Sequence, residues 1–469
     1  MFEFFLILFL CVLLYKYLQQ YRGCGTNLPP GRMGIPILGE SLQFLHKKAK
    51  FFEGKRKEHG NIYKTHLFGR PTIRISGKKN LEKLFAAENK LLQCAYPTSV
   101  WKILGKNSLS SSTGQVHAEK KIQLLKCLSP GFFDQNLPVV SDFLTGRIYE
   151  WCRKSSIEIF ADCHSMFLEL ASTFLVSMDM PKDERKKIQT LYHDITNNLF
   201  TLPLNIPGFG FHKACKAKEE LKSLFLKRIK EDGKTCSQQF PTVLEKFCKS
   251  QNSEFDNDDL LNGIFELIFN AGETTSTSAM CALVHLSKHP EVLEKLRQEL
   301  SNIDLLAPPE ENNNSEVEVT TEIFNKLPYL DCVYKEILRV TPAVGGAYRK
   351  VLQTFELEGY TIPEGWTVVL GIRDTHELDS NLKDPLTFNP DRWLQADSSK
   401  ISFFPFASGP RRCPGKGYAH LILKLFIIKL CQQCNWTLSE PNPEMVAMPT
   451  PRPKNKLMGS FTLREHYKE

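Results

Sequence analysis

Hydrophobic positions recur at helical spacing over most of the chain. Residues 259–287 keep this spacing over their whole length, which predicts one long helix, and residues 421–430 predict another. Alternation over residues 72–76 predicts a short strand, and Phe355–Leu357 with Tyr360–Ile362 predict a hairpin around a Glu-Gly turn. The sequence therefore predicts a mainly helical fold with small β-sheets.

The N-terminus is the most apolar part of the chain. Only Glu3 and Lys16 interrupt residues 1–18, and no small-x-small cleavage site follows. We expect residues 1–22 to form a membrane anchor, with Lys16 and Arg22 keeping its C-terminal side cytoplasmic. A buried core helix is the alternative.

Prolines and glycines over residues 23–40 predict a stiff hinge after the anchor, because paired prolines cannot continue a helix. Beyond residue 40 the sequence has no second linker of this kind. The Asn-rich, acidic residues 308–318 predict a surface loop between helices. Residues 41–469 are thus expected to form a single large domain.

Composition excludes several classes of protein. With 42% hydrophobic and 24% charged residues, wholesale disorder is excluded, and one apolar stretch is too few for a polytopic membrane protein. The net charge of +8 is mild for 469 residues and fits an acidic protein partner or an anionic membrane as well as nucleic acid. Because the charge gathers in local basic faces, we favour the first two and predict no nucleic-acid partner. The 14 cysteines are mostly scattered, as in a reducing compartment.

One cysteine stands apart from the others. Cys413 lies within FPFASGPRRCPGKG, residues 404–417, where glycines and prolines hold an open turn just before a predicted helix. Loop amides and a helix N-terminus are expected to lower the pKa of this thiol. A thiolate acts as a nucleophile or as an axial ligand of haem iron, whereas a buried structural cysteine is the alternative.

Four ordered motifs give the chain a resemblance to the cytochrome P-450 superfamily. Phe406-x-x-Gly409-x-Arg411-x-Cys413-x-Gly415 is similar to its haem-binding signature, and Glu336-x-x-Arg339 to its ExxR helix. The element ending in Pro390-Asp391-Arg392 and the sequence Asn270-Ala271-Gly272-Glu273-Thr274-Thr275 match two further motifs. The resemblance implies the cytochrome P-450 fold with haem b, and with O2 and NADPH-derived electrons as co-substrates.

The resemblance also assigns roles to single residues. Cys413 becomes the axial ligand of the haem iron, and Glu273 with Thr274 becomes the pair that relays protons to oxygen. A carboxylate and two guanidinium groups form a buried structural triad: Glu336, Arg339 and Arg392. The remaining haem-binding candidates, mainly donors to the propionates, are Arg411, Arg349, His376, His117, Lys121 and Phe406. For His376 alone, a satisfied surface histidine is the alternative.

Segments between these motifs resemble the retinoic acid hydroxylase branch, among them residues 63–71 and 99–105. This implies oxidation of all-trans-retinoic acid, chiefly at ring C4, in retinoic acid catabolism. An apolar pocket with one cation suits such a substrate. The expected pocket residues are Val100, Trp101, Leu104, Phe269, Asn270, Val344 and Met448. Candidates for binding the substrate carboxylate are Arg70, Arg74 and Lys102.

Partners follow from charge and from the resemblance. A basic proximal face is expected to attract NADPH–cytochrome P-450 reductase at the endoplasmic reticulum membrane. The residues of this face are Lys120, Lys121, Lys126, Arg412 and Lys416. The Asn270-Ala271 pair departs from the family pattern, which keeps a sterol or another acidic lipid open as substrate. The further alternatives are a lipid-peroxide isomerase and a non-catalytic haem or lipid-binding protein.

Overall fold

The computed structural model describes residues 27–231, 257–306 and 320–465, apart from Ser177 and Asp179, and six residues nearer the N-terminus. Most of the expected anchor, residues 1–22, and the expected surface loop at 308–318 lie outside the described residues. Within the described part, the stretch Ile159–Val176 is long and apolar enough to cross a membrane by composition. It is largely buried in the protein, as a core helix is.

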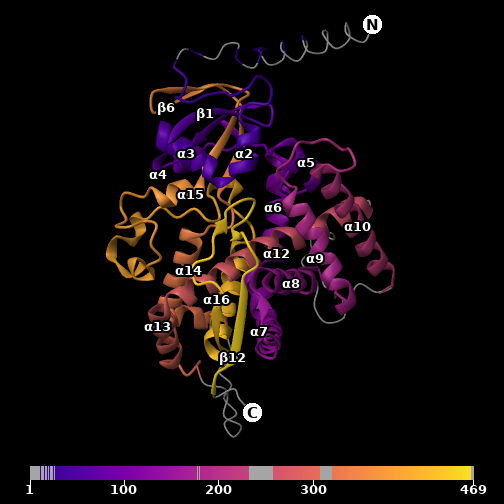
Figure 1. Cartoon of the computed structure of the whole chain (residues 1–469), viewed down its shortest axis with the longest axis vertical. Helices are drawn as coiled ribbons and strands as arrows, with labels where there is room; N and C mark the ends of the chain where they lie inside the picture. Colours follow the sequence, from indigo (N-terminus) through magenta and orange to yellow (C-terminus); the bar gives the residue numbers. More distant parts are fainter. Residues whose placement is uncertain are drawn as a thin grey trace.

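Helices make up most of the molecule (Figure 1). The α-helices are α2 (Ser41–Lys47), α3 (Ala49–His59), α4 (Lys78–Ala86), α5 (Thr98–Leu104), α6 (Gly114–Cys127), α7 (Pro130–Cys152), α8 (Ile159–Ala171), α9 (Lys182–Asn197), α10 (Gly210–Glu231), α12 (Asn257–Lys288), α13 (Pro290–Ser301), α14 (Pro328–Val340), α15 (Ile372–Glu377) and α16 (Lys416–Gln433). The short π- or 3-10 helices are η1 (Ser172–Val176), η2 (Thr321–Lys326), η3 (Pro390–Leu394), η4 (Ala396–Lys400) and η5 (Gly409–Arg411). The predicted long helix is confirmed as α12, and residues 421–430 lie within α16.

Within the described residues, four small sheets accompany the helices. The strands are β1 (Ile62–Leu67), β2 (Arg70–Ile75), β3 (Leu92–Cys94), β4 (Ile157–Glu158), β5 (Gly346–Val351), β6 (Phe355–Leu357), β7 (Tyr360–Ile362), β8 (Thr367–Gly371), β9 (Cys434–Leu438), β10 (Met445–Val446), β11 (Arg452–Pro453) and β12 (Met458–Leu463). The largest sheet has the order β1-β2-β8-β5-β3, with only β2 and β8 parallel. β2 and the β6–β7 hairpin confirm the predicted strands.

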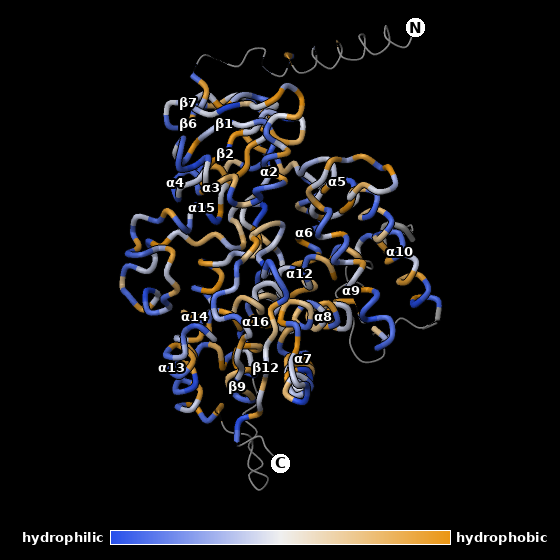
Figure 2. The backbone as a smooth tube through the Cα atoms, in the orientation of Figure 1, coloured by the Kyte–Doolittle hydropathy of each residue, from blue (hydrophilic) through white to orange (hydrophobic). Residues whose placement is uncertain are grey.

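The largest sheet lies at one end of the molecule with α2, α3, α4 and α15, and the helical body fills the other end (Figure 1). In Figure 2 the hydrophobic residues gather where α8, α12 and α16 meet. α16 is apolar around most of its circumference, so it is stable only where other helices cover it on all sides. It packs against α7 and α12.

The chain from Asn27 onward is bound to the sheet. The Lys64 amide donates a hydrogen bond to the Pro30 carbonyl at 2.7 Å, and Leu28 and Met33 pack against buried residues of the sheet. The hinge predicted over residues 23–40 is therefore attached to the body along most of its length.

Candidate functional site

The loop before α16 presents Cys413 on a fixed backbone. The Cys413 amide donates to the Phe406 carbonyl at 2.9 Å, which closes the turn, and half-buried Phe406 packs against the main core. Gly409 has a φ of +65°, and a Cβ there would collide with the Phe85 carbonyl oxygen on α4. Glycine is required at this position for both reasons. The turn therefore holds the sulfur at the N-terminal end of α16.

The direction predicted for the Cys413 pKa was wrong. Burial raises the pKa of this thiol above its usual range, although the Gly415 amide and the charge of Lys121 oppose the rise. Amides and a helix N-terminus do not compensate for desolvation here. The free thiol is thus protonated at neutral pH, and a bound metal ion would be the group that deprotonates it.

Cys413 combines two properties that rarely occur together. Its side chain is exposed, and yet the surrounding protein raises its pKa by desolvation. A side chain is exposed and desolvated at the same time when it faces a space inside the protein. Tyr96 shows the same combination, because it is half-buried while burial raises its pKa far above the usual range.

The middle of α12 also faces open space on one side. Asn270 is exposed and Ala271 and Thr274 are half-buried, although the helix is otherwise largely buried. These three residues share one face of the helix. The Thr274 hydroxyl donates to the Asn270 carbonyl at 2.7 Å, as expected for a threonine bonded to the carbonyl four residues earlier. The Asn270 amide reaches the Ser110 hydroxyl at 3.4 Å.

Glu273 lies on a different face of α12 from Thr274. It is 3% exposed, and its Oε1 is 2.7 Å from Nε2 of His164 on α8. Burial alone would raise the pKa of Glu273, but attraction to His164 and hydrogen bonds from His164 and Thr196 lower it below its ordinary value. The structure therefore brings the predicted acid to a histidine rather than to the face that carries the hydroxyl.

Cationic groups converge near the cysteine loop, where propionates are expected. Arg411 donates to the carbonyls of Ser110 and Ser112, both at 2.7 Å, and Lys121 donates to the Pro410 carbonyl at 2.8 Å. Burial and, to a smaller extent, the charges of Arg411, Lys121 and Arg349 together lower the pKa of His117 to about 4. His117 is thus neutral among three cations. Arg349 is already paired with Glu88, so two carboxylates would balance the charges of Arg411 and Lys121, and the donor set fits the propionates of haem.

Arg349 is held in the same region by Glu88. Its Nε lies 2.5 Å from Glu88 Oε2, and the other carboxylate oxygen accepts from the Cys94 amide at 2.9 Å. Glu88 is 4% exposed and lies far from the recognised motifs in sequence, so nothing in the sequence around it indicated a role at this site. Tyr96 was also missed, and its pKa responds to both Arg411 and Arg349.

His376 is not a propionate donor. It is fully buried, its Nδ1 lies 3.1 Å from the Arg339 carbonyl oxygen, and its Nε2 accepts from the Phe404 amide at 2.8 Å. Both ring nitrogens are therefore used by the backbone, so the prediction was wrong, as was the alternative of a surface histidine. Burial lowers the pKa of His376 to about 3, which keeps the ring neutral.

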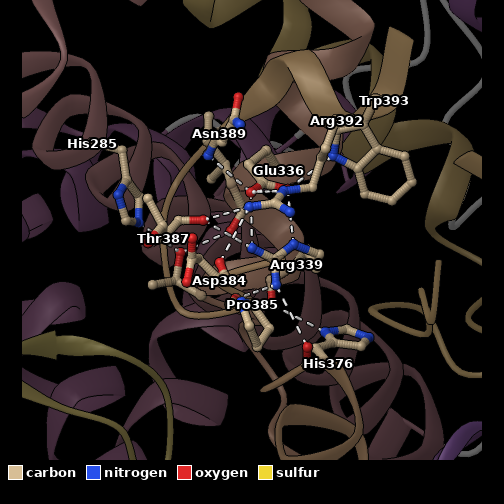
Figure 3. A network of polar contacts seen from close by, with 12 residues as sticks. His285, Glu336, Arg339, His376, Asp384, Pro385, Thr387, Asn389, Arg392 and Trp393 are labelled. Atoms are coloured by element: carbon tan, nitrogen blue, oxygen red, sulfur yellow. Dashed lines mark hydrogen bonds and ion pairs between the residues drawn. The ribbon is translucent and has the colours of Figure 1, made fainter. Parts of the chain in front are cut away.

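The predicted triad is confirmed in geometry (Figure 3). Glu336, which is 0% exposed, accepts hydrogen bonds from Arg339 Nε and Nη2 at 2.8 Å and from Arg392 Nε at 2.9 Å. Trp393 Nε1 at 2.9 Å and the Asn389 amide at 3.0 Å complete its shell. The guanidinium groups also reach backbone carbonyls over residues 383–387. The network ties α14 to the chain segment that leads to the cysteine loop.

The expected pocket residues divide into two groups. Trp101, Asn270 and Val344 are exposed, whereas Val100, Leu104 and Phe269 are buried in the main core. Phe269 stacks on Phe265 and Tyr192. Met448 packs on the aromatic cluster beside α2 and α3. Exposed side chains are free to face a ligand, so Trp101 on α5, Asn270 on α12 and Val344 before β5 are the best placed of this set.

Arg74 is not available to a substrate carboxylate. It is 4% exposed, and its Nε lies 2.8 Å from Asp374 Oδ2. Arg70 and Lys102 are exposed. Of the three carboxylate candidates, these two therefore stay open.

Known proteins provide an independent comparison. Residues 29–458 match the family model of cytochrome P-450. Cytochrome P-450 26A1 of Danio rerio is 32% identical over 455 residues, which cover 94% of this chain and 91% of the relative. Cytochrome P-450 26B1 of Xenopus tropicalis is 33% identical over 453 residues, with 94% and 88% covered. A solved structure, retinoic acid bound cyanobacterial CYP120A1, has a TM-score of 0.85 and 29% identity and covers 94% of this chain and 100% of its own.

Proposed function

The chain belongs to the cytochrome P-450 family, and on this premise we propose that it is a haem-thiolate monooxygenase that hydroxylates all-trans-retinoic acid, chiefly at ring C4. The observation that carries the proposal is the fold-wide match to a structure with retinoic acid bound. Relatives named cytochrome P-450 26A1 and 26B1 match over nearly the whole chain and support the same branch.

Haem, when bound, supplies the iron at which dioxygen is reduced and one oxygen atom is inserted into the substrate. The protein holds the other parts of the reaction. Cys413 would offer the sulfur ligand, and Arg411, Arg349, Lys121 and neutral His117 would bind the propionates. The face of α12 that carries Asn270 and Thr274 would border the space in which a lipid lies.

The carboxylate of retinoic acid needs a cation or amide to bind it. Since Arg74 is paired with Asp374, we propose Lys102 on α5, with Arg70 as the second choice. In the described structure the Lys102 ammonium lies 5.8 Å from the centre of the Phe211 ring on α10. Lys102→Gln should weaken retinoic acid binding and leave the binding of retinol, which lacks the carboxylate, unchanged.

The central experiment uses purified full-length protein loaded with haem. Reduction under carbon monoxide should give the absorption band typical of thiolate ligation, and reductase, NADPH and retinoic acid together should give hydroxyretinoic acid. Cys413→Ala should abolish the band and the product, whereas Cys215→Ala on α10 should change neither. A band without product from any acidic lipid or sterol would favour a non-catalytic haem protein.

We also propose a reductase as the electron donor and the endoplasmic reticulum membrane as the location. Lys126, Arg412 and Lys416 are exposed on α6 and around the cysteine loop, and Lys121 bonds these two elements together through Pro410. An acidic partner docked on this basic surface would lie close to Cys413. The anchoring of residues 1–22 remains a prediction from the sequence.

A further inference from the structure

Asn270 brings an amide group to the side of α12 that faces open space. It is exposed, although Ile268, Phe269 and Gly272 close to it in sequence are buried. The Asn270-Ala271 pair departs from the family pattern, so the chemistry that all P-450 enzymes share does not account for an amide at this place. In ligand pockets, a few well-placed polar groups determine which ligand binds and in which orientation. The amide is therefore a candidate for substrate selection.

The loop that carries Ser110 is fixed to α12 one turn before Asn270. Glu266 is 7% exposed, and its two carboxylate oxygens accept hydrogen bonds from the amides of Leu109 and Ser110, both at 2.7 Å. The Ser110 carbonyl accepts from Arg411 at 2.7 Å. Because both backbone groups of Ser110 are bonded, its hydroxyl is held in place relative to α12 and to the cysteine loop.

Asn270 and Ser110 form a polar pair with hydrogen-bonding capacity to spare. Nδ2 of Asn270 lies 3.4 Å from the Ser110 hydroxyl oxygen, which is longer than the usual distance of about 2.9 Å. A side-chain amide has two N–H donors and a carbonyl acceptor, and a hydroxyl group both donates and accepts. One long contact uses a small part of this set, and the exposed amide can be reached from the open space. An oxygen atom of a ligand could therefore bond to both groups.

The pair lies at the part of α12 that carries the oxygen motif. Asn270 is four residues from Thr274, which is roughly 6 Å along the helix axis. Lys102, the cation proposed for the substrate carboxylate, is on α5, and α5 approaches α12 near Asn262, because a Cβ on Gly105 would lie 3.6 Å from Asn262 Oδ1. Asn262 is eight residues from Asn270, or roughly 12 Å along the axis. The amide and the carboxylate site are thus at different ends of a long ligand.

We propose that Asn270, together with Ser110, selects lipid acids that already carry a hydroxyl or keto oxygen near the carbon to be oxidised. Among retinoids these are acids with an oxygen on the ring. An unsubstituted ring presents only hydrocarbon to the amide and leaves its polar atoms without a partner. Pockets built to hydrogen-bond a substrate oxygen discriminate strongly against analogues that lack it, for this reason. The inference rests on the proposed function and narrows its substrate class.

The test is a binding titration of the full-length haem protein, followed by the shift in haem absorbance. The two ligands are retinoic acid and 4-oxoretinoic acid, which differ in one ring oxygen. The wild type should bind 4-oxoretinoic acid on the order of ten-fold more tightly, as expected from one additional hydrogen bond. Asn270→Leu keeps a side chain of similar size without its hydrogen bonds, and it should bring the two affinities together.

Asn61→Leu is the matched control, because Asn61 is an exposed asparagine directly before β1, in the largest sheet and not in the helical body. It should keep the ten-fold preference. If Asn270→Leu does not retain haem, Ser110→Ala takes its place and should also reduce the preference, since it removes one of the two groups that would bind the ring oxygen.

Two results would overturn the proposal: equal affinities of the wild type for the two ligands, or a preference that persists in the variant of the pair. Both would mean that the amide faces solvent and not the substrate. If neither retinoid shifts the haem absorbance of the wild type, the proposed function itself fails. A wild type that binds both retinoids equally well refutes only this inference.

Discussion

Replacing Glu336 by Gln should destabilise the protein by about 4 kcal/mol, because breaking a buried ion pair costs roughly 3–5 kcal/mol. Glu336 is fully buried and its two oxygens accept five hydrogen bonds, three of them from guanidinium groups. The amide of Gln offers one oxygen, and its NH2 group would face donors. Two or three of the five bonds are then lost, depending on which position the amide oxygen takes, and Arg339 and Arg392 keep buried charges without a counter-ion.

The size of this loss matters for folding. A typical domain is stable by about 5–15 kcal/mol, so the variant should lose a large part of its stability. The assay is urea unfolding of the haem-loaded protein, followed both by circular dichroism and by haem absorbance. Both signals should shift to lower urea together, because the network ties α14 to the segment that leads to the cysteine loop.

Asp391→Asn is the matched control, one residue before Arg392. Asp391 pairs with Lys295 at 2.7 Å, but the two side chains are 55% and 46% exposed. Exposed ion pairs contribute about 0–1 kcal/mol, so this variant should unfold almost as the wild type does. If Glu336→Gln and Asp391→Asn unfold within about 1 kcal/mol of each other, the network does not have the role assigned to it.

Three further predictions follow from buried, strained and charged positions. His376 has a pKa of about 3 in the folded chain against 6.5 ordinarily. Its contribution to the free energy of unfolding should therefore be constant above pH 6.5 and fall toward pH 3, by up to about 1.4 kcal/mol per pH unit. Urea midpoints that do not change between pH 7 and pH 5 would contradict this. Gly409→Ala should lose haem on purification because of its positive φ and the collision behind it, whereas Gly131→Ala, with open space around it, should retain haem; equal haem contents would refute the argument. Reversing the charges of Lys126 and Lys416 should slow reduction by reductase on the order of ten-fold at low salt. A difference that persists at high salt would mean that steering is not the cause.

The sequence predicted the parts of the site that depend on local order. The motif around Cys413 and the three residues of the triad were found from spacing and resemblance, and the structure shows the expected contacts among Glu336, Arg339 and Arg392. The long helix and the hairpin were also predicted correctly, because their hydrophobic periodicity depends only on residues close together in sequence. These predictions needed no knowledge of which segments pack together.

The predictions that were wrong concerned side chains whose properties depend on burial and on partners remote in sequence. The pKa of Cys413 goes up because desolvation exceeds the effect of the loop amides, and a motif contains no information on desolvation. His376 is used by backbone groups at Arg339 and Phe404, which are remote in sequence. Arg74 is paired with Asp374, three hundred residues away. Each error came from treating a side chain as free before its neighbours were known.

The geometry of α12 explains why the partner of Glu273 escaped notice. Consecutive residues on an α-helix point about 100° apart, so an acid and a hydroxyl that adjoin in sequence face different neighbours. Thr274 faces the open side with Asn270, and Glu273 faces α8, where its Oε1 lies 2.7 Å from His164 Nε2. An acid held in this way points toward α8 and away from the side of α12 that carries Thr274. A sequence motif in which the two residues are neighbours therefore does not place their side chains on the same face of the helix.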